Sequence, residues 1–399
     1  MAKKIAGIAV VILLLAYSVT LILHISAHSD QYLWDFRTHR EAGQILASGS
    51  NPYDAAILFP KARTNFLYTY PPATLFFYRL FALPDYKTAF HIFLIAKFII
   101  LVGLVYFWHR EFLKEDGGIL FYAFCLLAFN STVFLDMIAG NINLVQQALL
   151  WLGFSFYIKS RYALFCLFTL LAASFKMTPI FFLILMLLPD DKHKYKYFFG
   201  AGALFLSYLL IQYLIVPELF TGFIKNALEV VGEPGGVVPS TNKLIAGLFE
   251  VVAKITGLAL PQAWQSAIFI AIAAAVVFFS YKACLRLKQA QSDNRAMLEV
   301  FVVCLVYALI HPRFKDYGYI LLIVPSFYII KNIHYPKITP FLFILFVMSN
   351  RMMLPIFSSL YDVVWAFFPL MVAYCVWGIY VYQILGESTL AVEVKNTGS

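Results

Sequence analysis

One short polar stretch carries the residue types that can do acid–base chemistry. Residues 33–72 lie between two strongly apolar segments and contain Asp35, Arg37 and His39 close together. Charged side chains beside a membrane span are costly, so they often mark functional sites. This makes Asp35 the candidate catalytic carboxylate of the chain. Residues Asp35 to Leu46 have helical composition, which predicts a helix that ends near Gly49. That this helix is only an amphipathic surface helix with an Arg37–Glu41 ion pair stays an open alternative.

Three further polar groups interrupt the apolar sequence. Lys176 and Pro179 lie near the middle of the apolar run 162–188, which predicts two half-length helices that meet at a break. Residues 136–143 connect two expected spans, and residues 311–317 precede another. The lysine either lines a cavity or extends its ammonium group to the lipid headgroups. The other two segments either bind substrate or hydrogen-bond between helices.

The composition is that of an integral membrane protein. Of the 399 residues, 62% are hydrophobic and only 13% are charged. The apolar runs lack the alternation of an outer-membrane barrel. The net charge of +9 comes largely from short loops between spans, where it acts as a topology signal, and no nucleic-acid-binding face is visible. Free, buried thiols are predicted for the five cysteines, which are Cys125, Cys166, Cys284, Cys304 and Cys375.

The expected fold is an all-α, polytopic helical bundle with about 12 membrane segments. An uncleaved helix is favoured over a signal peptide for the first apolar run, at 5–24. The apolar residues after Pro72 are either a short interfacial or broken helix followed by one span, or two spans. Further spans are expected near 119–135, 142–158, 264–283, 297–311, 317–332, 338–350 and 361–384, with another that ends near Val216.

The domain prediction is one transmembrane domain over residues 1–385. Two large extracytoplasmic loops, at 25–72 and 217–261, are expected to carry short interfacial helices. The polar tail at 386–399 is predicted to be disordered and cytoplasmic.

The distribution of Lys and Arg predicts the sidedness of these loops. With Met1 inside, the basic short loops at 159–161, 189–196, 282–295 and 331–337 all lie inside. The Asp35 loop, Lys176 and the segments 136–143, 217–261 and 311–317 then lie outside. This predicts a multi-pass protein of the plasma (inner) membrane with an extracytoplasmic active site. Reading 162–188 as one crossing would invert part of this topology.

Six motifs in the chain together resemble one known family. They are WDFRTHREAGQILASGSNPYD (34–54), FLYTYPPATLFF (66–77), AGNINLVQQALL (139–150), AASFKMTPIFF (172–182), STNKLIAGLF (240–249) and HPRFKDYGYILLIVP (311–325). In this order they resemble GT-C glycosyltransferases of family 87, which use polyprenyl-phosphate sugars. Each motif is short and degenerate, so the specificity lies in the set.

The resemblance implies a membrane glycosyltransferase with a GT-C-like fold. It would transfer a hexosyl group, with mannose favoured, from a polyprenyl-phosphate sugar to an extracytoplasmic glycan or glycolipid. The acceptor hydroxyl attacks with inversion while Asp35 takes its proton. The cations expected at the leaving phosphate are Lys176, Arg313, Lys315 and His311. The other candidate substrate-binding residues are Arg37, Tyr70, Asp136, Asn141, Asn143, Asn242 and Asp316.

One departure from the family pattern and two alternative functions remain to be considered. Many family members have a Ser-Pro pair with a histidine a few residues later, where this chain has His311-Pro312 and then Asp316. A transporter or lipid-linked-sugar flippase, or a non-catalytic component of a polysaccharide assembly complex, is the alternative function. Transporters tend to show inverted repeats, and no internal repeat is visible here. No cofactor is expected, and no metal, since the outer loops lack an Asp-x-Asp signature.

Overall fold

The described part of the chain is helical throughout its regular elements. The computed structural model describes residues 2–28, 31–114, 118–231, 238–258, 260–290, 294–332 and 366–386. In these ranges no strand occurs, which confirms the all-α prediction. Among the described residues, five helical segments are long and apolar enough to cross a membrane: Tyr86–Leu113, Ile119–Ala139, Lys194–Ile215, Gln262–Gln289 and Phe368–Gly386. The figure of about 12 crossings stays a prediction. The span expected at 338–350 and the tail beyond Gly386 lie outside the described residues.

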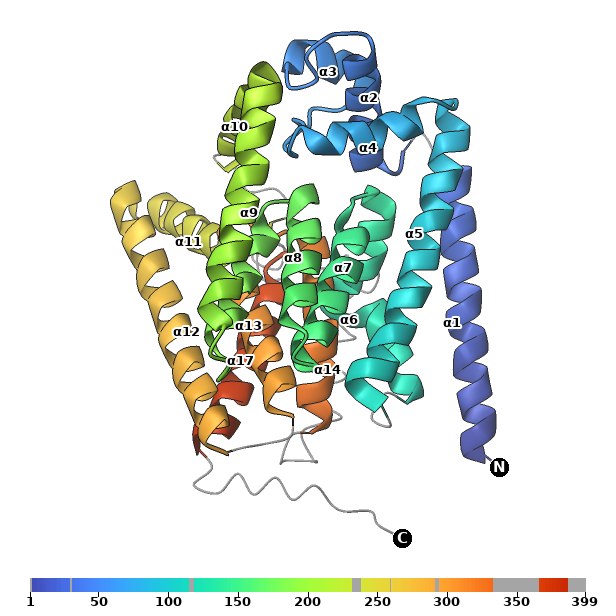
Figure 1. Cartoon of the computed structure of the whole chain (residues 1–399). Helices are drawn as coiled ribbons and strands as arrows, with labels where there is room; N and C mark the ends of the chain where they lie inside the picture. The colour runs from blue at the N-terminus through green and yellow to red at the C-terminus, as the bar shows by residue number, and fades with distance from the viewer. Residues whose placement is uncertain are drawn as a thin grey trace. The chain divides into compact units, whose positions relative to one another are not determined.

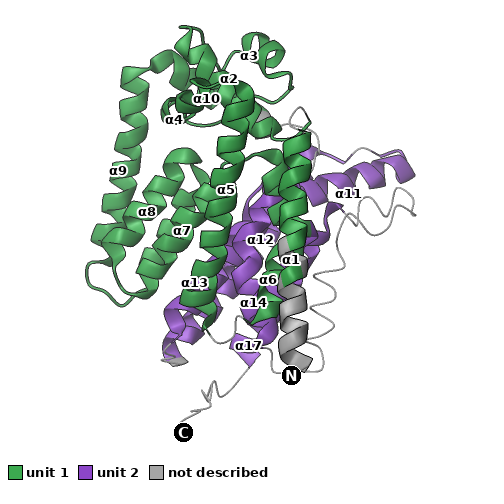
Figure 2. Ribbon diagram, turned by 90° about the vertical axis from the view of Figure 1, so that its right-hand side faces the viewer, with its two compact units in different colours: residues 1–127, 131–236 green, residues 128–130, 237–399 purple. Residues whose placement is uncertain are grey.

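The chain divides into two compact units (Figure 2), one formed by residues 1–127 and 131–236 and the other by 128–130 and 237–399. The helices of the first unit are α1 (Ala2–Ala27), α2 (Trp34–Ala47), α3 (Ala55–Ala62), α4 (Ala73–Ala82), α5 (Tyr86–Trp108), η1 (His109–Leu113), α6 (Ile119–Ala139), α7 (Asn143–Ile158), α8 (Tyr162–Phe175), η3 (Thr178–Leu187), α9 (Lys194–Ile215) and α10 (Pro217–Val231). Those of the second are α11 (Thr241–Thr256), α12 (Gln262–Ala290), α13 (Arg295–Ile310), η4 (Asp316–Leu322), α14 (Ile323–Lys331) and α17 (Phe368–Gly386). The single-domain expectation stays a prediction.

In unit 1, short helices form a layer at one end of the longer ones. Both views show α2, α3, α4 and α10 together at this end (Figures 1 and 2). The predicted helix around Asp35 is therefore present as α2. The apolar run after Pro72 forms the short helix α4 and one long helix, α5, which is the first of the two predicted arrangements.

Close packing fixes α2 within this end layer. Its buried face includes Phe36, whose ring stacks on Phe93 of α5 with centroids 4.3 Å apart. On another side, Gly43 lies against α4, because a Cβ there would be only 2.9 Å from the backbone nitrogen of Arg79. A larger residue at this position would push the two helices apart. The position of α2 therefore depends on a glycine as well as on apolar burial.

The break expected in the apolar run 162–188 is present. Helix α8 ends at Phe175, Lys176 has an extended backbone (φ −152°), and the 3₁₀ helix η3 begins at Thr178. Pro179 in the first turn of η3 has no N–H to continue the ladder of α8. With 14 and 10 residues, α8 and η3 are each shorter than the length that crosses a bilayer.

Helix α6 contains a left-handed turn. Phe129, Asn130 and Ser131 have φ values of 53°, 58° and 56°. Such angles cost residues with a Cβ about 1–2 kcal/mol each. The turn lies in a polar run that includes Thr132, and all of these side chains are buried.

Unit 2 is built around α13, in which 11 of the 16 residues are buried. Side-chain hydrogen bonds connect α17 to its neighbours. Trp377 Nε1 donates to Ser280 Oγ of α12 at 2.8 Å, and the Tyr380 hydroxyl donates to the Leu298 carbonyl of α13 at 3.2 Å. The Tyr374 hydroxyl is hydrogen-bonded to Thr241 Oγ1 of α11 at 2.9 Å. Helix α11 begins at Thr241, with the Ser240 side chain accepting from the Lys243 N–H. The predicted second outer loop therefore carries two helices, α10 and α11.

The cysteine prediction is correct except at one position. All five cysteines are free thiols, and four of them are buried. Cys375 is exposed on α17, so its predicted burial was wrong. An apolar run alone does not tell which face of a helix turns away from the protein.

Candidate active site

Asp35 is half-buried in the first turn of α2. Immediately before the helix, the Leu33 N–H donates to the carbonyl of Ile138 at 2.7 Å, which connects the start of α2 to the end of α6. Gly140 ends α6 with φ +69°, and a Cβ there would lie 2.9 Å from the Leu33 Cα. Only glycine fits both the backbone angle and the close approach. The sequence therefore brings Asp35 against the turn between α6 and α7.

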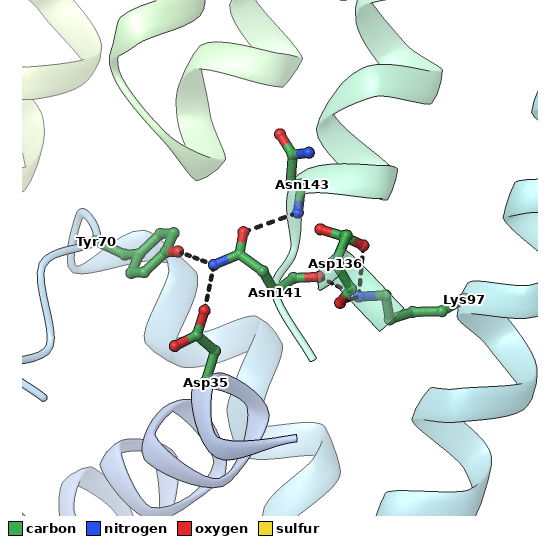
Figure 3. A network of polar contacts seen from close by, with 6 residues as sticks. All are labelled: Asp35, Tyr70, Lys97, Asp136, Asn141 and Asn143. Carbon is green, nitrogen blue, oxygen red and sulfur yellow. Dashed lines mark hydrogen bonds and ion pairs between the residues drawn. The ribbon is translucent and has the colours of Figure 1, made fainter. Parts of the chain in front are cut away.

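Asn141 in this turn holds the Asp35 carboxylate (Figure 3). Its Nδ2 donates to Asp35 Oδ2 at 2.7 Å and to the Tyr70 hydroxyl at 3.0 Å. Its Oδ1 accepts from the Asn143 N–H at 3.0 Å, at the start of α7. Because the Oδ1 position is fixed by a backbone donor, the amide group can present only its two N–H groups to Asp35 and Tyr70.

A buried ion pair lies behind the same turn. Lys97 of α5 and Asp136 of α6 are 1% and 0% exposed, and the Lys97 Nζ lies 2.6 Å from Asp136 Oδ2. The ammonium group also donates to the carbonyls of Asp136 at 2.5 Å and Asn141 at 2.9 Å (Figure 3). Asp136 was expected in a loop, but α6 continues to Ala139 and places it on a helix. Lys97 is not among the predicted site residues, although a lysine within an apolar span is the signal that could have indicated it.

Tyrosines surround the buried His39 on the other side of α2. The His39 ring centroid lies 4.5 Å from that of Tyr70, 4.6 Å from Tyr78 and 5.4 Å from Tyr68. Burial raises the pKa of Tyr68, so its phenol stays neutral. Tyr68, Tyr70 and Tyr78 therefore form a packed aromatic wall that places the Tyr70 hydroxyl beside Asn141.

Helix α10 holds this aromatic wall in place. Asn226 Nδ2 donates to the carbonyls of Tyr53 at 3.0 Å and Tyr68 at 3.2 Å. The Tyr53 hydroxyl donates in turn to the Tyr70 carbonyl at 2.6 Å. Close approach supports the contact, because a Cβ on Gly222 of α10 would lie 2.7 Å from Tyr53 Cβ. The polar loop 33–72 and the helix α10 thus form one structure within unit 1.

The other predicted residues of unit 1 lie around this arrangement. The Arg37 Nε donates to the Tyr86 hydroxyl at the start of α5 at 3.2 Å, and Glu41 pairs with Arg40 at 2.7 Å. Lys176 is half-buried at the α8–η3 break and lies close enough to Asp136 for their charges to attract. The charge of Asp136 therefore interacts with the charges of both Asp35 and Lys176.

The predicted residues of unit 2 gather at the turn between α13 and η4. Ser240 Oγ donates to the Pro312 carbonyl at 2.7 Å, and Thr241 Oγ1 donates to the Leu309 carbonyl at 2.6 Å. These bonds connect two motifs that are about 70 residues apart, since their donors and acceptors are separated by 72 and 68 positions. The side chains at this junction are Asn242, His311, Arg313 and Lys315, all half-buried, and the buried Asp316.

Local contacts orient the side chains of this junction. His311 Nδ1 accepts from the Arg313 N–H at 3.1 Å, which fixes the imidazole ring across the turn. The Lys315 ammonium lies 5.7 Å from the ring centroid of Tyr317. The junction thus presents cations on a short segment held by backbone hydrogen bonds.

The chemistry open to the unit 1 site is that of a carboxylate base. Asn141 donates a hydrogen bond to Asp35 Oδ2, and within the described ranges no group donates to Asp35 Oδ1. An oxygen in that state can accept a proton from an incoming hydroxyl group. Among the described residues, no group of three or more His, Cys, Asp or Glu side chains is placed to hold a metal ion. The expected independence from metals stays a prediction.

The fold and the site define a class: an all-helical membrane protein with a half-buried acid held in an end layer. The chain belongs to glycosyltransferase family 87, whose family model matches residues 68–312, more than half of the chain. It is therefore a transferase enzyme. No curated protein and no solved structure is significantly similar to it. Asp35 lies outside the matched residues, but its hydrogen-bond partner Asn141 lies inside them.

Proposed function

We propose that this enzyme is a GT-C glycosyltransferase that transfers a hexosyl group, most simply mannose, from a polyprenyl-phosphate sugar. The acceptor is an extracytoplasmic glycan or glycolipid, and the protein is a multi-pass component of the plasma (inner) membrane. Family membership supports an enzyme over a transporter or an assembly scaffold. The lipid-linked donor is supported by the membrane helices, because a donor anchored in the bilayer must be met by a protein in the bilayer.

Asp35 is the general base of this reaction. The acceptor O–H attacks the anomeric carbon, the bond from that carbon to the phosphate oxygen breaks, and the hydroxyl proton goes to Asp35 Oδ1. The polyprenyl phosphate leaves with the bonding electron pair, and the anomeric configuration inverts. The observation that carries the assignment is the Asp35–Asn141 hydrogen bond of 2.7 Å, which orients the carboxylate and leaves its second oxygen for the acceptor.

The leaving phosphate needs positive charge. Lys176, at a backbone break inside an apolar run, is one candidate, and the half-buried Arg313, Lys315 and His311 are the others. The remaining polar residues, among them Asn143 and Asn242, are candidate contacts for sugar hydroxyls. Transfer by this route needs no covalent intermediate and no second carboxylate.

A donor screen with the purified full-length protein tests the donor class. Polyprenyl-phosphate mannose, arabinose and glucose are each incubated with candidate glycan acceptors, alongside the matching nucleotide sugars. The expected result is transfer from a lipid-linked sugar, with the one-bond C1–H1 coupling at the anomeric carbon of the product showing inversion. Transfer only from a soluble nucleotide sugar would overturn the donor class, and a retained configuration would overturn the single-base mechanism.

A further inference from the structure

We infer that Lys97, inside the apolar helix α5, is a positioning residue that holds the Asp35 base through the α6–α7 turn and Asn141. The inference rests on the proposed function, in which Asp35 takes the acceptor proton. Lys97 itself does not reach Asp35 through any hydrogen bond described above. Its contacts are with the turn whose side chain, Asn141, holds the carboxylate.

The ammonium group of Lys97 has three hydrogens and three oxygen partners. They are Asp136 Oδ2, the Asp136 carbonyl and the Asn141 carbonyl, all within 2.9 Å. The carbonyl of Asp136 belongs to the last turn of α6, where it also accepts from the Gly140 N–H at 3.1 Å, and a positive charge is favoured at this end of a helix. Lys97 thus closes the end of α6 and fixes the next turn by its backbone.

Stability alone does not account for a charge pair at this depth. Replacing a buried ion pair by apolar residues of similar volume is often neutral or stabilising, because desolvation offsets the attraction between the charges. What the apolar replacement cannot supply is a donor for the Asn141 carbonyl. A rigid Asn141 backbone keeps the Asn141 side chain in the position from which it donates to Asp35 at 2.7 Å.

A series of hydrogen bonds connects Lys97 to the proposed base. Lys97 fixes the Asn141 carbonyl, the Asn143 N–H fixes the Asn141 side-chain oxygen, and the Asn141 amide nitrogen fixes Asp35 (Figure 3). Displacement of a reacting group by about 1 Å can cost about 100-fold in rate. Loss of the Lys97 contact should therefore slow the chemical step without weakening donor binding.

The test replaces both charges at once, so that neither is left buried alone. We expect Lys97→Met with Asp136→Leu to give folded protein whose kcat falls about 10- to 100-fold, while KM for polyprenyl-phosphate mannose changes less than about twofold. The matched control is Arg295→Met with Glu299→Leu, which removes a largely buried ion pair of 2.7 Å in unit 2. The control should keep kcat per folded molecule.

A double-mutant cycle separates positioning from other roles. In an Asp35→Asn background, measured in single turnovers with excess enzyme, the Lys97 and Asp136 replacements should cause no further loss. An unchanged kcat in the folded pair variant, an additive loss on Asp35→Asn, or a raised donor KM with unchanged kcat would each overturn the inference.

Three further outcomes separate a failure of the inference from a failure of the proposed function. If the Met and Leu pair does not fold, Lys97→Gln with Asp136→Asn keeps the shape and removes both charges, and the same kcat and cycle criteria apply. If Asp35→Asn alone keeps full transfer, the proposed base is wrong and the inference falls with it. Full loss in Asp35→Asn together with an unaffected pair variant would leave the base intact and remove only the role of Lys97.

Discussion

The two polar regions of the molecule differ in how their charged side chains are buried and paired. At the α6–α7 turn of unit 1, the charged Lys97 and Asp136 are fully buried and compensate each other. At the α13–η4 turn of unit 2, the cations are half-buried, and hydroxyl groups of Ser240 and Thr241 hold the backbone. A compensated network suits a base that must stay in one place. A backbone-held segment with accessible cations suits a ligand that brings its own negative charge.

The largest expected effect comes from breaking the compensation in unit 1. Lys97→Met leaves Asp136 as a buried charge without its ammonium partner, and such losses typically destabilise by about 3–5 kcal/mol. We expect little folded protein and a strongly lowered thermal midpoint in detergent. Adding Asp136→Leu should restore most of the stability, and a single variant as stable as the natural chain would contradict the buried pair.

The next effect tests the close approach that brings Asp35 to the turn. Gly140→Ala adds a Cβ 2.9 Å from Leu33 at φ +69°, so it carries both overpacking and a backbone cost, together about 2–4 kcal/mol. The matched control is Gly257→Ala, with φ +71° and nothing within 4 Å of the added Cβ. Chemical denaturation should show the larger loss for Gly140→Ala, and equal losses would argue against the contact.

A smaller effect is expected from one cation of unit 2. Lys315→Gln removes a charge proposed to meet the leaving phosphate, and a charge-assisted hydrogen bond contributes about 1.5–3 kcal/mol. We expect a donor KM raised about tenfold or more with the folded state unchanged. Lys331→Gln, at the exposed end of α14, is the control. An unchanged KM for Lys315→Gln would remove this residue from the phosphate site.

The smallest effect concerns the support of those cations. Ser240→Ala removes the donor to the Pro312 carbonyl and the acceptor at the start of α11, which should cost about 1 kcal/mol. Ser48→Ala serves as the control, since the Ser48 hydroxyl donates to the Ile45 carbonyl in the last turn of α2 and so makes a local hydrogen bond. The thermal unfolding midpoint of Ser240→Ala should be lower than that of Ser48→Ala. The reverse order would show that the Ser240–Pro312 contact adds little stability.

Local sequence patterns predicted much of the fold. The helix around Asp35 and the break at Lys176 and Pro179 are present where the residue types require them. The break was predictable because proline removes a backbone donor whatever its neighbours are. The exposure of Cys375 was not predictable, because the neighbouring helices decide which face of a uniformly apolar helix is buried.

The site was predictable only in part. Asp35 and Asn141 were named, but their hydrogen bond depends on the approach of Leu33 to Gly140, a tertiary contact with no local signal. Lys97 was missed because the surrounding run is apolar enough to be assigned as a span, which draws attention away from its one internal charge. An intramembrane lysine is costly, and that cost was the signal for a partner.

The central claim is that Asp35 is the base of hexosyl transfer, and one comparison tests it most directly. Single-turnover transfer from polyprenyl-phosphate mannose is measured for Asp35→Asn and for Asp54→Asn, an exposed acid of the same loop whose role in capping α3 asparagine can keep. We predict a loss of about 10²- to 10⁴-fold for Asp35→Asn, with donor binding retained, and no loss for Asp54→Asn. Transfer by Asp35→Asn within about twofold of the natural enzyme would contradict the account.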